Sequence, residues 1–161
     1  MRCWLILAAE LGLRISETLR VSDATHNPQT RTITITTKGT KPRTLPTTDE
    51  LEALFGLAPP ANDPTTPLIA RLLGRPISQG QLRRYWSKLK KQTGTREEIH
   101  PHDLRRSAAE RLYDQTRDIR AVQRLLGHDD LTSTMQYLEH YDPENLRPLI
   151  DSLKIPTPRE Q

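Results

Sequence analysis

The first apolar run of the chain, residues 2–11, has the spacing of a short buried helix, and Gly12 follows where helices commonly end. Ser16 is a residue type that favours a helix N-cap, so a second helix is predicted from there to about Val21. Arg14 then falls in the connection between the two helices. The N–H groups of a helix N-terminus attract anions, so this is a good position for binding a negatively charged ligand.

Strict alternation replaces the helical spacing in the stretch TRTITITTK, where Ile33 and Ile35 alternate with threonines. A period of two with β-branched residues predicts a strand with one apolar face. Gly39 interrupts this strand and an extended run follows it. Residues 30–47 are therefore predicted to form a β-hairpin with Lys38 at or near its tip.

Capping boxes indicate the starts of two further helices. The first, at Thr47 and Glu50, begins a helix that ends before the proline-rich loop 58–67. The second, at Ser78, begins a helix that should end near Gly94. Leucine and tryptophan form the apolar stripe of this helix, and its other faces hold five basic residues, Arg83, Arg84, Lys88, Lys90 and Lys91.

Two helices are predicted after residue 100, over residues 102–115 and 119–126. Asp118 and Gly127 are the expected caps of the second helix, so His128 lies just past its end. Tyr137 follows nine positions later, which would place it on the opposite face of one straight helix from His128. The chain must bend between them, and a new short helix is expected to begin near Thr132.

The composition favours one domain with a lean core. The chain has 161 residues, 34% of them hydrophobic and 4% aromatic, so the core should consist mainly of aliphatic side chains. Cys3 is the only cysteine, which excludes an internal disulfide and a cysteine metal site. No run approaches the roughly 18 apolar residues of a membrane span, so we expect a soluble, cytoplasmic protein.

Positive charge is concentrated in the middle of the chain. Residues 71–106 hold ten basic and three acidic side chains, whereas residues 1–70 are balanced and the remainder has a charge of −3. A central basic block is typical of a nucleic-acid-binding surface, although a solvated helix face would have the same composition.

Six polar residues stand at helix ends, at the hairpin tip or after the last glycine, and the two arginines, one lysine and two histidines among them would suit holding a phosphodiester and moving protons around it. The six residues are Arg14, Lys38, His102, Arg105, His128 and Tyr137. Arg105 follows His102 by three positions, so both point to one side of a helix. Taken singly, each residue is more often a surface or packing residue than a functional one.

The segments around these residues resemble the catalytic boxes of the tyrosine recombinases, the phage integrase and Xer-like family. The matching stretches are LGLRISETL (11–19), the KG of TKGTKPRTLP (37–46), HDLRRS (102–107), LLGH (125–128) and Tyr137, in that family's order. A lone HxxR is a weak signal, but six matched positions in order are specific. The resemblance implies a mainly α-helical α+β fold, with a small antiparallel sheet (hairpin about 30–47) packed on a helical bundle.

The resemblance also implies a covalent mechanism. Tyr137 would attack the scissile DNA phosphate and form a 3′-phosphotyrosyl intermediate, followed by strand exchange and religation without ATP or metal. Arg14 and Arg105 would bind the non-bridging phosphate oxygens, since the planar guanidinium matches that geometry. No cofactor is expected, and the HxH pair formed by His100 and His102 lacks a second pair at metal spacing.

Proton transfer and support are implied for four more residues. Lys38 would protonate the leaving 5′ oxygen, and His102 would transfer a proton at the tyrosine. His128 would hydrogen-bond a phosphate oxygen, and Glu17 would support the arginines. We also expect contacts with the DNA backbone or groove from basic residues, namely Lys41, Arg43, Arg83, Arg84, Lys88, Lys90, Lys91 and Arg106.

The family usually has a helical DNA-binding domain ahead of the catalytic one, whereas Arg14 lies close to the start of this chain. Residues 1–161 are therefore expected to form the catalytic domain without that core-binding domain. The apolar stripe within residues 142–161 would dock on its own domain or in trans on a neighbouring protomer. The expected partner is double-stranded DNA, which the protein would bind in the nucleoid. The chain is expected to be a monomer in solution and a tetramer on synapsed DNA, with no membrane association.

Two other functions remain open at this point. A topoisomerase that nicks and reseals DNA through a 3′-phosphotyrosine uses similar residues, but the short chain and the LGH box favour a recombinase. A non-catalytic DNA-binding regulator could use the same fold. The presence of all six positions argues against the regulator.

Overall fold

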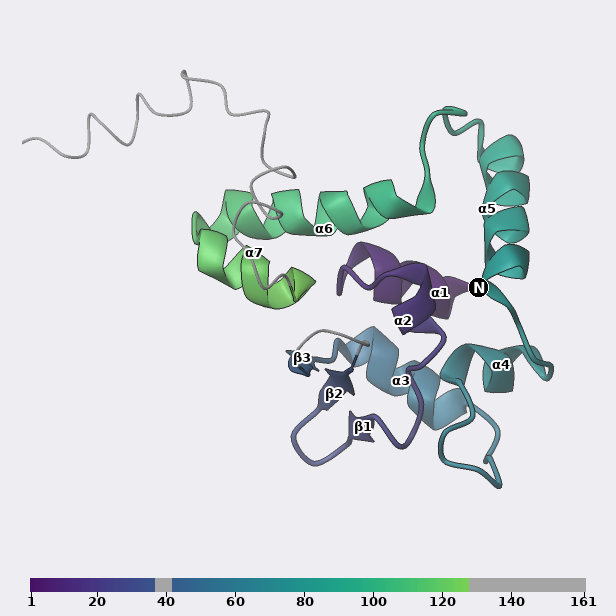
Figure 1. Ribbon diagram of the computed structural model, residues 1–161. Helices are drawn as coiled ribbons and strands as arrows, with labels where there is room; N and C mark the ends of the chain where they lie inside the picture. The colour runs from purple at the N-terminus through teal and green to yellow at the C-terminus, as the bar shows by residue number, and fades with distance from the viewer. Residues whose placement is uncertain (37–41, 128–161) are drawn as a thin grey trace, which may run out of the picture.

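The computed structural model describes residues 1–36 and 42–127, which form a mainly helical molecule with one small sheet (Figure 1). The predicted α+β class is therefore confirmed. The helices are α1 (Arg2–Ala9), α2 (Ile15–Thr18), α3 (Asp49–Leu57), α4 (Leu68–Leu73), α5 (Gln79–Thr93), α6 (Pro101–Thr116) and α7 (Ile119–Leu126). The strands are β1 (His26–Asn27), β2 (Thr32–Ile35) and β3 (Arg43–Pro46).

The sheet has the strand order β1-β2-β3, with both neighbouring pairs antiparallel. Ile33 pairs with Leu45, and both side chains are buried together with Ile35, which confirms the predicted apolar face of the hairpin. The short strand β1 was not predicted, because two residues give no periodic signal of their own. It exists through its pairing with β2, where His26 lies opposite Ile33.

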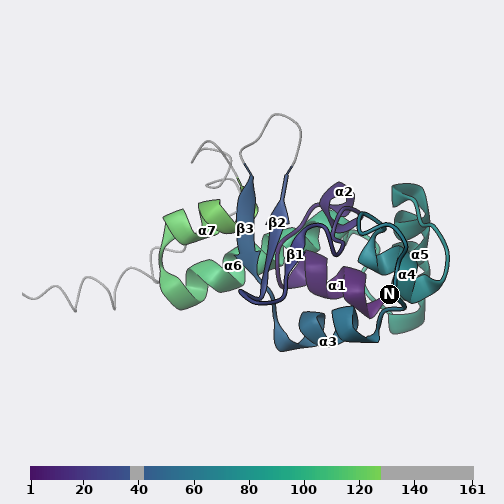
Figure 2. The ribbon, with the colours of Figure 1, turned by 90° about the horizontal axis from the view of Figure 1, so that it is seen from below.

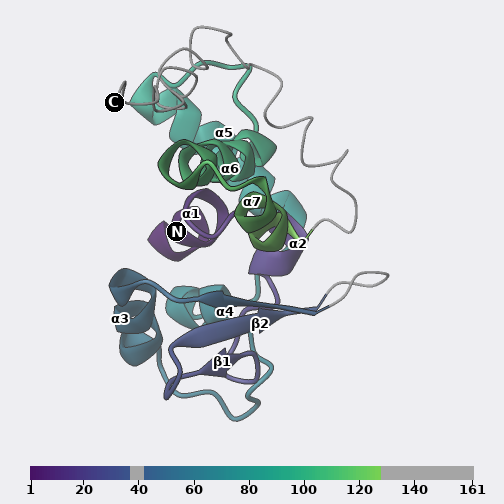
Figure 3. The same ribbon diagram turned by 90° about the vertical axis from the view of Figure 1, so that its left-hand side faces the viewer.

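The elements form two layers, which Figure 3 shows edge on. One layer contains α1, α5, α6 and α7, and the other contains the sheet with α3 and α4 (Figure 3). Within its layer, helix α1 contacts α6, and it also contacts α3 of the other layer. Trp4 of α1 meets Trp86 of α5 edge to face, with ring centroids 5.8 Å apart, and the Trp86 indole N–H donates to the Ile99 carbonyl at 2.9 Å. The aromatic pair thus fastens α5 to the main core.

Helices α6 and α7 form a hairpin at the other end of the molecule. Ala109, Val122 and Leu126 make a second, smaller apolar cluster between them. As predicted, the side chain of Asp118 caps α7 by accepting from the Arg120 N–H, and Gly127 ends the helix with φ of 63°. Residue 127 is the last described residue, so the short helix expected near Thr132 and the apolar stripe within residues 142–161 lie outside the described part of the chain.

Three predicted helix boundaries were wrong. The second helix begins after Arg14 rather than Ser16 and ends at Thr18, because the Glu17 carboxylate accepts the backbone N–H of Arg14 at 2.8 Å. The cap of α3 is Thr48 rather than Thr47, whose hydroxyl instead donates to the Arg31 carbonyl and to Glu52.

Helix α4 was not predicted, since its six residues follow a proline-rich loop and bury Leu68, Ile69 and Ala70 without a capping side chain. The capping box at Ser78 and the left-handed Gly94 define α5 as expected. Within the described ranges, no helix is long and apolar enough to cross a membrane.

Candidate functional site

The connection between α1 and α2 brings a buried carboxylate to the centre of the molecule. Glu17 is fully buried at the third position of α2, where it accepts the backbone N–H of Arg14 at 2.8 Å. This local bond fixes the direction of the carboxylate and sets the start of the helix at the residue after Arg14. The side chain of Arg14 also reaches Glu17, from Nη1 to Oε1 at 3.2 Å, and remains 36% exposed.

Two further guanidinium groups surround the same carboxylate. Arg43 of β3 donates from Nη1 to Oε1 at 3.1 Å and from Nη2 to Oε2 at 2.9 Å. Arg105 of α6 approaches Oε2 at 3.5 Å. Burial alone would raise the pKa of Glu17, but the hydrogen bonds from Arg43 and Arg14 and the charges of Arg43 and Arg105 lower this pKa to about 2. Glu17 is therefore ionised, and the cluster of Glu17 with Arg14, Arg43 and Arg105 has a net charge of +2; we call it the arginine cluster.

Arg105 is almost completely buried and connects three parts of the fold. Its Nη1 donates to the Gly12 carbonyl at 2.5 Å, and its Nη2 donates to the Leu126 carbonyl at 2.6 Å. The Gly12 carbonyl lies in the segment after α1, and the Leu126 carbonyl belongs to the last residue of α7. One guanidinium thus ties α6 to the segment after α1 and to the end of α7 by satisfying a backbone acceptor in each.

His102 lies in the first turn of α6, one turn before Arg105. The helix begins with Pro101, and the Asp103 carboxylate accepts the His100 backbone N–H at 2.6 Å. The His102 side chain is exposed, yet the protein atoms around its ring lower its pKa; Arg105 and Arg14 lower it further, while Asp103 raises it. The ring is therefore neutral at pH 7 and can accept a proton.

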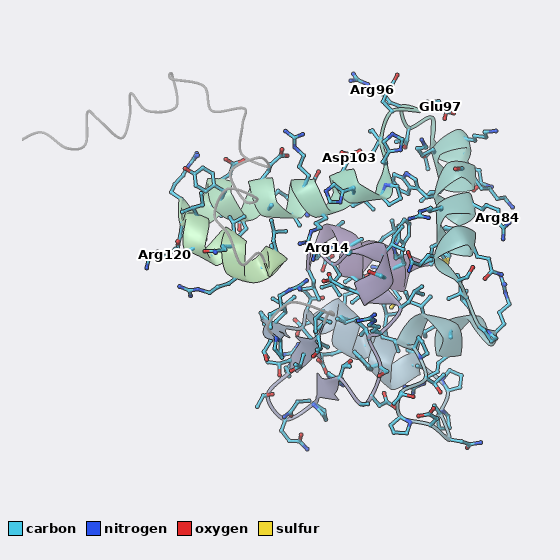
Figure 4. The ribbon with its side chains drawn as sticks, in the orientation of Figure 1. Arg14, Arg84, Arg96, Glu97, Asp103 and Arg120 are labelled. Carbon is cyan, nitrogen blue, oxygen red and sulfur yellow. The ribbon has the colours of Figure 1, made fainter. Side chains whose placement is uncertain are left out.

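A cleft of about 620 Å³ brings these groups together. Arg14, His102 and Arg105 line one part of it, and Arg83 and Trp86 of α5 line the other. In Figure 4 Arg14 lies beneath α6 and between α7 and α5, while Asp103 projects from the opposite, upper side of α6. The cleft therefore joins a proton acceptor and two arginines of the cluster to a helix with basic side chains, a combination that suits a phosphodiester.

Four of the predicted site residues, Arg14, Glu17, His102 and Arg105, come together in this way although they come from distant parts of the sequence. Four others, Lys38, Lys41, His128 and Tyr137, lie outside the described residues.

The predicted DNA contact of Arg43 does not fit its position. Its side chain is only 9% exposed and both of its Nη atoms bond to Glu17, so it is part of the arginine cluster. The sequence held no local signal of this pairing, because the two residues are 26 positions apart.

The basic residues of α5 divide between two surfaces. Arg83 lines the cleft, whereas Arg84 and Lys88 line a second hollow of about 400 Å³ together with Arg75. Figure 4 shows Arg84 on the side of α5 that faces away from Arg14. Lys91 is exposed near the end of the helix.

Two other basic residues that were expected to bind DNA have partners within the chain. Lys90 is buried, its ammonium group donates to the Glu97 carbonyl, and it lines the cleft; its contact with DNA stays a prediction. Arg106 is half-buried and donates from Nε to Glu110 at 2.8 Å, one turn along α6.

Comparisons with known proteins agree on one family. The sequence model described as the phage integrase family matches residues 1–144. Tyrosine recombinase XerC of Brucella suis biovar 1 is 35% identical over 149 residues, which cover 84% of this chain and 47% of that protein. XerC of Staphylococcus saprophyticus is 30% identical over 151 residues, covering 91% of this chain and 51% of that protein. The chain spans about half the length of these relatives.

Solved structures show the same fold. The XerH site-specific recombinase bound to its difH substrate in a pre-cleavage complex is 26% identical, with a TM-score of 0.71, and the match covers 95% of this chain and 46% of that chain. The XerA recombinase matches with a TM-score of 0.71 at 23% identity, covering 94% of this chain and 57% of that chain.

Proposed function

Because this chain belongs to the phage integrase family, we propose that it is the catalytic part of a site-specific tyrosine recombinase that cleaves and rejoins double-stranded DNA. The observation that supports the proposal best is the cleft lined by Arg14, Arg105 and His102, whose two arginines pair with the buried Glu17. Two guanidinium groups and a neutral imidazole in one cleft are the groups that phosphodiester cleavage by a tyrosine requires.

The arginine cluster supplies the positive charge for the scissile phosphate. A pentacoordinate phosphorane gains negative charge on its non-bridging oxygens as the transition state forms, and guanidinium forks stabilise that charge. Of the two arginines of the cluster that line the cleft, Arg14 is the more accessible, while Arg105 is held by two backbone carbonyls and cannot turn away. A fixed donor loses little entropy when the phosphate arrives, which favours catalysis.

Tyr137 is the proposed nucleophile. Its oxygen attacks the phosphorus, a P–O bond to the tyrosine forms, and the bond to the 5′ oxygen breaks. The tyrosine proton goes to His102, whose lowered pKa keeps the ring neutral and ready to accept it. Lys38 donates a proton to the leaving 5′ oxygen, and His128 hydrogen-bonds a phosphate oxygen. Attack by a new 5′ hydroxyl reverses these steps, so religation needs neither ATP nor metal.

Double-stranded DNA is the proposed partner. The XerH structure holds its difH substrate, and the central basic segment of this chain includes exposed cations on α5. Arg83 lies in the cleft itself, Arg84 and Lys88 line the second hollow, and Lys91 is exposed near the end of the helix, so α5 offers cations to DNA on two surfaces. We propose a monomer in solution and a tetramer on two synapsed DNA sites.

The proposed chemistry is tested with nicked duplexes, from which the cleaved fragment diffuses away and leaves the covalent adduct trapped. The wild-type chain should capture its preferred sequence from a library of such duplexes with randomised arms, and a denaturing gel should show the adduct. Tyr137→Phe should give none. An adduct in the Phe variant would contradict the choice of nucleophile, and Tyr141 would be the next residue to change.

A second substrate tests Lys38. A 5′-phosphorothiolate has a sulfur leaving group that needs no proton, so it should restore cleavage by Lys38→Ala. Continued inactivity on this substrate would contradict the role of general acid. The same preparations separate the alternatives, because a non-catalytic regulator forms no adduct and a topoisomerase relaxes supercoiled plasmid without exchanging strands.

A further inference from the structure

Arg43 differs from the other two arginines around Glu17 in how it meets the carboxylate. It forms two parallel hydrogen bonds, from Nη1 to Oε1 at 3.1 Å and from Nη2 to Oε2 at 2.9 Å. The side chains of Arg14 and Arg105 reach one oxygen each, at 3.2 Å and 3.5 Å. Because a bidentate guanidinium–carboxylate pair is the strongest form of this contact, Arg43 offsets most of the carboxylate's charge.

Arg43 also lies close against the C-terminal end of α7. Strand β3 lies beside α7 (Figure 2), and a Cβ added to Gly127 would lie 2.6 Å from Nη1 and 2.8 Å from Cδ of Arg43. The guanidinium is thus enclosed between the carboxylate and the C-terminal end of α7. Both Nη atoms bond to Glu17 and the Nε atom is buried, so the guanidinium presents little to a phosphate.

The ion pair between Arg43 and Glu17 affects the other two arginines, because it determines how strongly the carboxylate attracts them. An ionised, fully buried carboxylate attracts every cation near it strongly, since little water screens the interaction. If Arg43 were absent, the carboxylate would draw the more exposed Arg14 toward itself and would bind the fixed Arg105 more strongly, because both already lie within 3.5 Å of it. A guanidinium held in that way has fewer N–H groups and less charge to offer a phosphate.

We propose that Arg43 is a positioning residue that neutralises Glu17 and thereby leaves Arg14 and Arg105 available to the scissile phosphate. The inference deepens the proposed function and rests on it, because the ligand of the two arginines is the DNA phosphodiester. Arg43 itself does not touch the phosphate and acts only through the carboxylate.

Removal and rescue test this role. In single-turnover cleavage of a nicked duplex captured from the library, Arg43→Ala should slow the reaction by about 10²-fold at saturating DNA. The double variant Glu17→Gln/Arg43→Ala should recover most of that rate, because a neutral amide no longer competes for the two arginines. A purely structural role for Arg43 predicts the opposite, a double variant that is at least as slow as Arg43→Ala.

Arg71 provides a matched control. Its side chain is 8% exposed, bonds to Asp23 at 2.6 Å and to the carbonyls of Ala58 and Pro59, and lies outside the residues that line the cleft. Arg71→Ala therefore removes an equally buried guanidinium and its ion pair. It should lower stability and leave the cleavage rate at saturating DNA unchanged.

Inorganic phosphate provides a readout that does not depend on cleavage. The arginine side-chain NMR resonances of Arg14 should shift on titration with phosphate, with an apparent affinity that falls about tenfold in Arg43→Ala and returns in the double variant. Equal phosphate affinities in wild type and Arg43→Ala would overturn the inference. A chain that shows this Arg43-dependent binding but captures no DNA would support the inference and contradict the proposed function.

Discussion

A methyl group added at Gly127 probes the contact between α7 and Arg43. Gly127 has φ of +63°, and an added Cβ would lie 2.6 Å from Nη1 of Arg43. Gly74 and Gly94 end α4 and α5 at φ of +65° and +66°, and an added Cβ at either meets nothing within 4 Å. These two positions share the left-handed backbone without the clash, so they serve as matched controls.

The expected loss of stability has two parts. A Cβ on a left-handed residue costs about 1–2 kcal/mol, which is all that Gly74→Ala and Gly94→Ala should lose. Gly127→Ala must also push Arg43 from its carboxylate; since breaking a buried ion pair costs about 3–5 kcal/mol, a partial displacement should add about 2 kcal/mol. With a urea m-value of about 2 kcal/mol/M, the midpoint should fall about 1 M further than in the controls.

Urea unfolding followed by tryptophan fluorescence measures this difference, because Trp4 and Trp86 are buried against each other. In an Arg43→Ala background the cost of Gly127→Ala should shrink to the control value, since the clashing atoms are gone. A Gly127→Ala midpoint within about 0.3 M of that of Gly94→Ala would refute the reasoning, because it would mean that Arg43 yields without loss.

Three other predictions concern charge. The pKa of Glu17 is about 2 instead of 4.5, so the stability it contributes is complete above pH 4.5 and lost as the pH falls toward 2; Glu17→Gln should remove this loss from acid unfolding curves. Asp103 partly offsets the lowering of the His102 pKa, so Asp103→Asn should lower this pKa further and move the acid limb of the cleavage pH profile to lower pH. An acid limb that does not move would argue against His102 as the proton acceptor. Lys88→Ala should reduce the slope of log Kd for DNA against log salt by about 0.9 in anisotropy titrations, whereas Lys90→Ala, at a buried position, should leave the slope unchanged. Equal slopes for the two variants would contradict this distinction between an exposed and a buried lysine.

Local signals predicted the elements that depend on local bonds. The Ser78 capping box and Gly94 defined α5, and Asp118 and Gly127 defined α7, because these residues bond to backbone groups within one turn. The alternation around Ile33 predicted the hairpin for a similar reason, since one face of it had to be buried.

Long-range pairing decided what the sequence did not predict. Lys90 and Arg43 look like surface cations in the sequence, and only the folded chain brings Glu97 to one and Glu17 to the other. The cap of α2 was misplaced because Glu17, a buried acid, fixes the start of the helix in place of Ser16. The motif order singled out Arg14, His102 and Arg105, which line one cleft in the structure, and Glu17, which lies buried beside Arg14 and Arg105.

The bonds of Arg105 to the carbonyls of Gly12 and Leu126 bear on how an inactive form of the protein should be prepared. Truncation of this arginine would leave two main-chain acceptors without their donor and a buried acid with one cation fewer, so the preparation would lose solubility along with activity. A biological assay would then not distinguish a protein that fails to accumulate from one that is folded but inactive. A folded but inactive variant should therefore be made by substituting Tyr137, with Arg105 left unchanged.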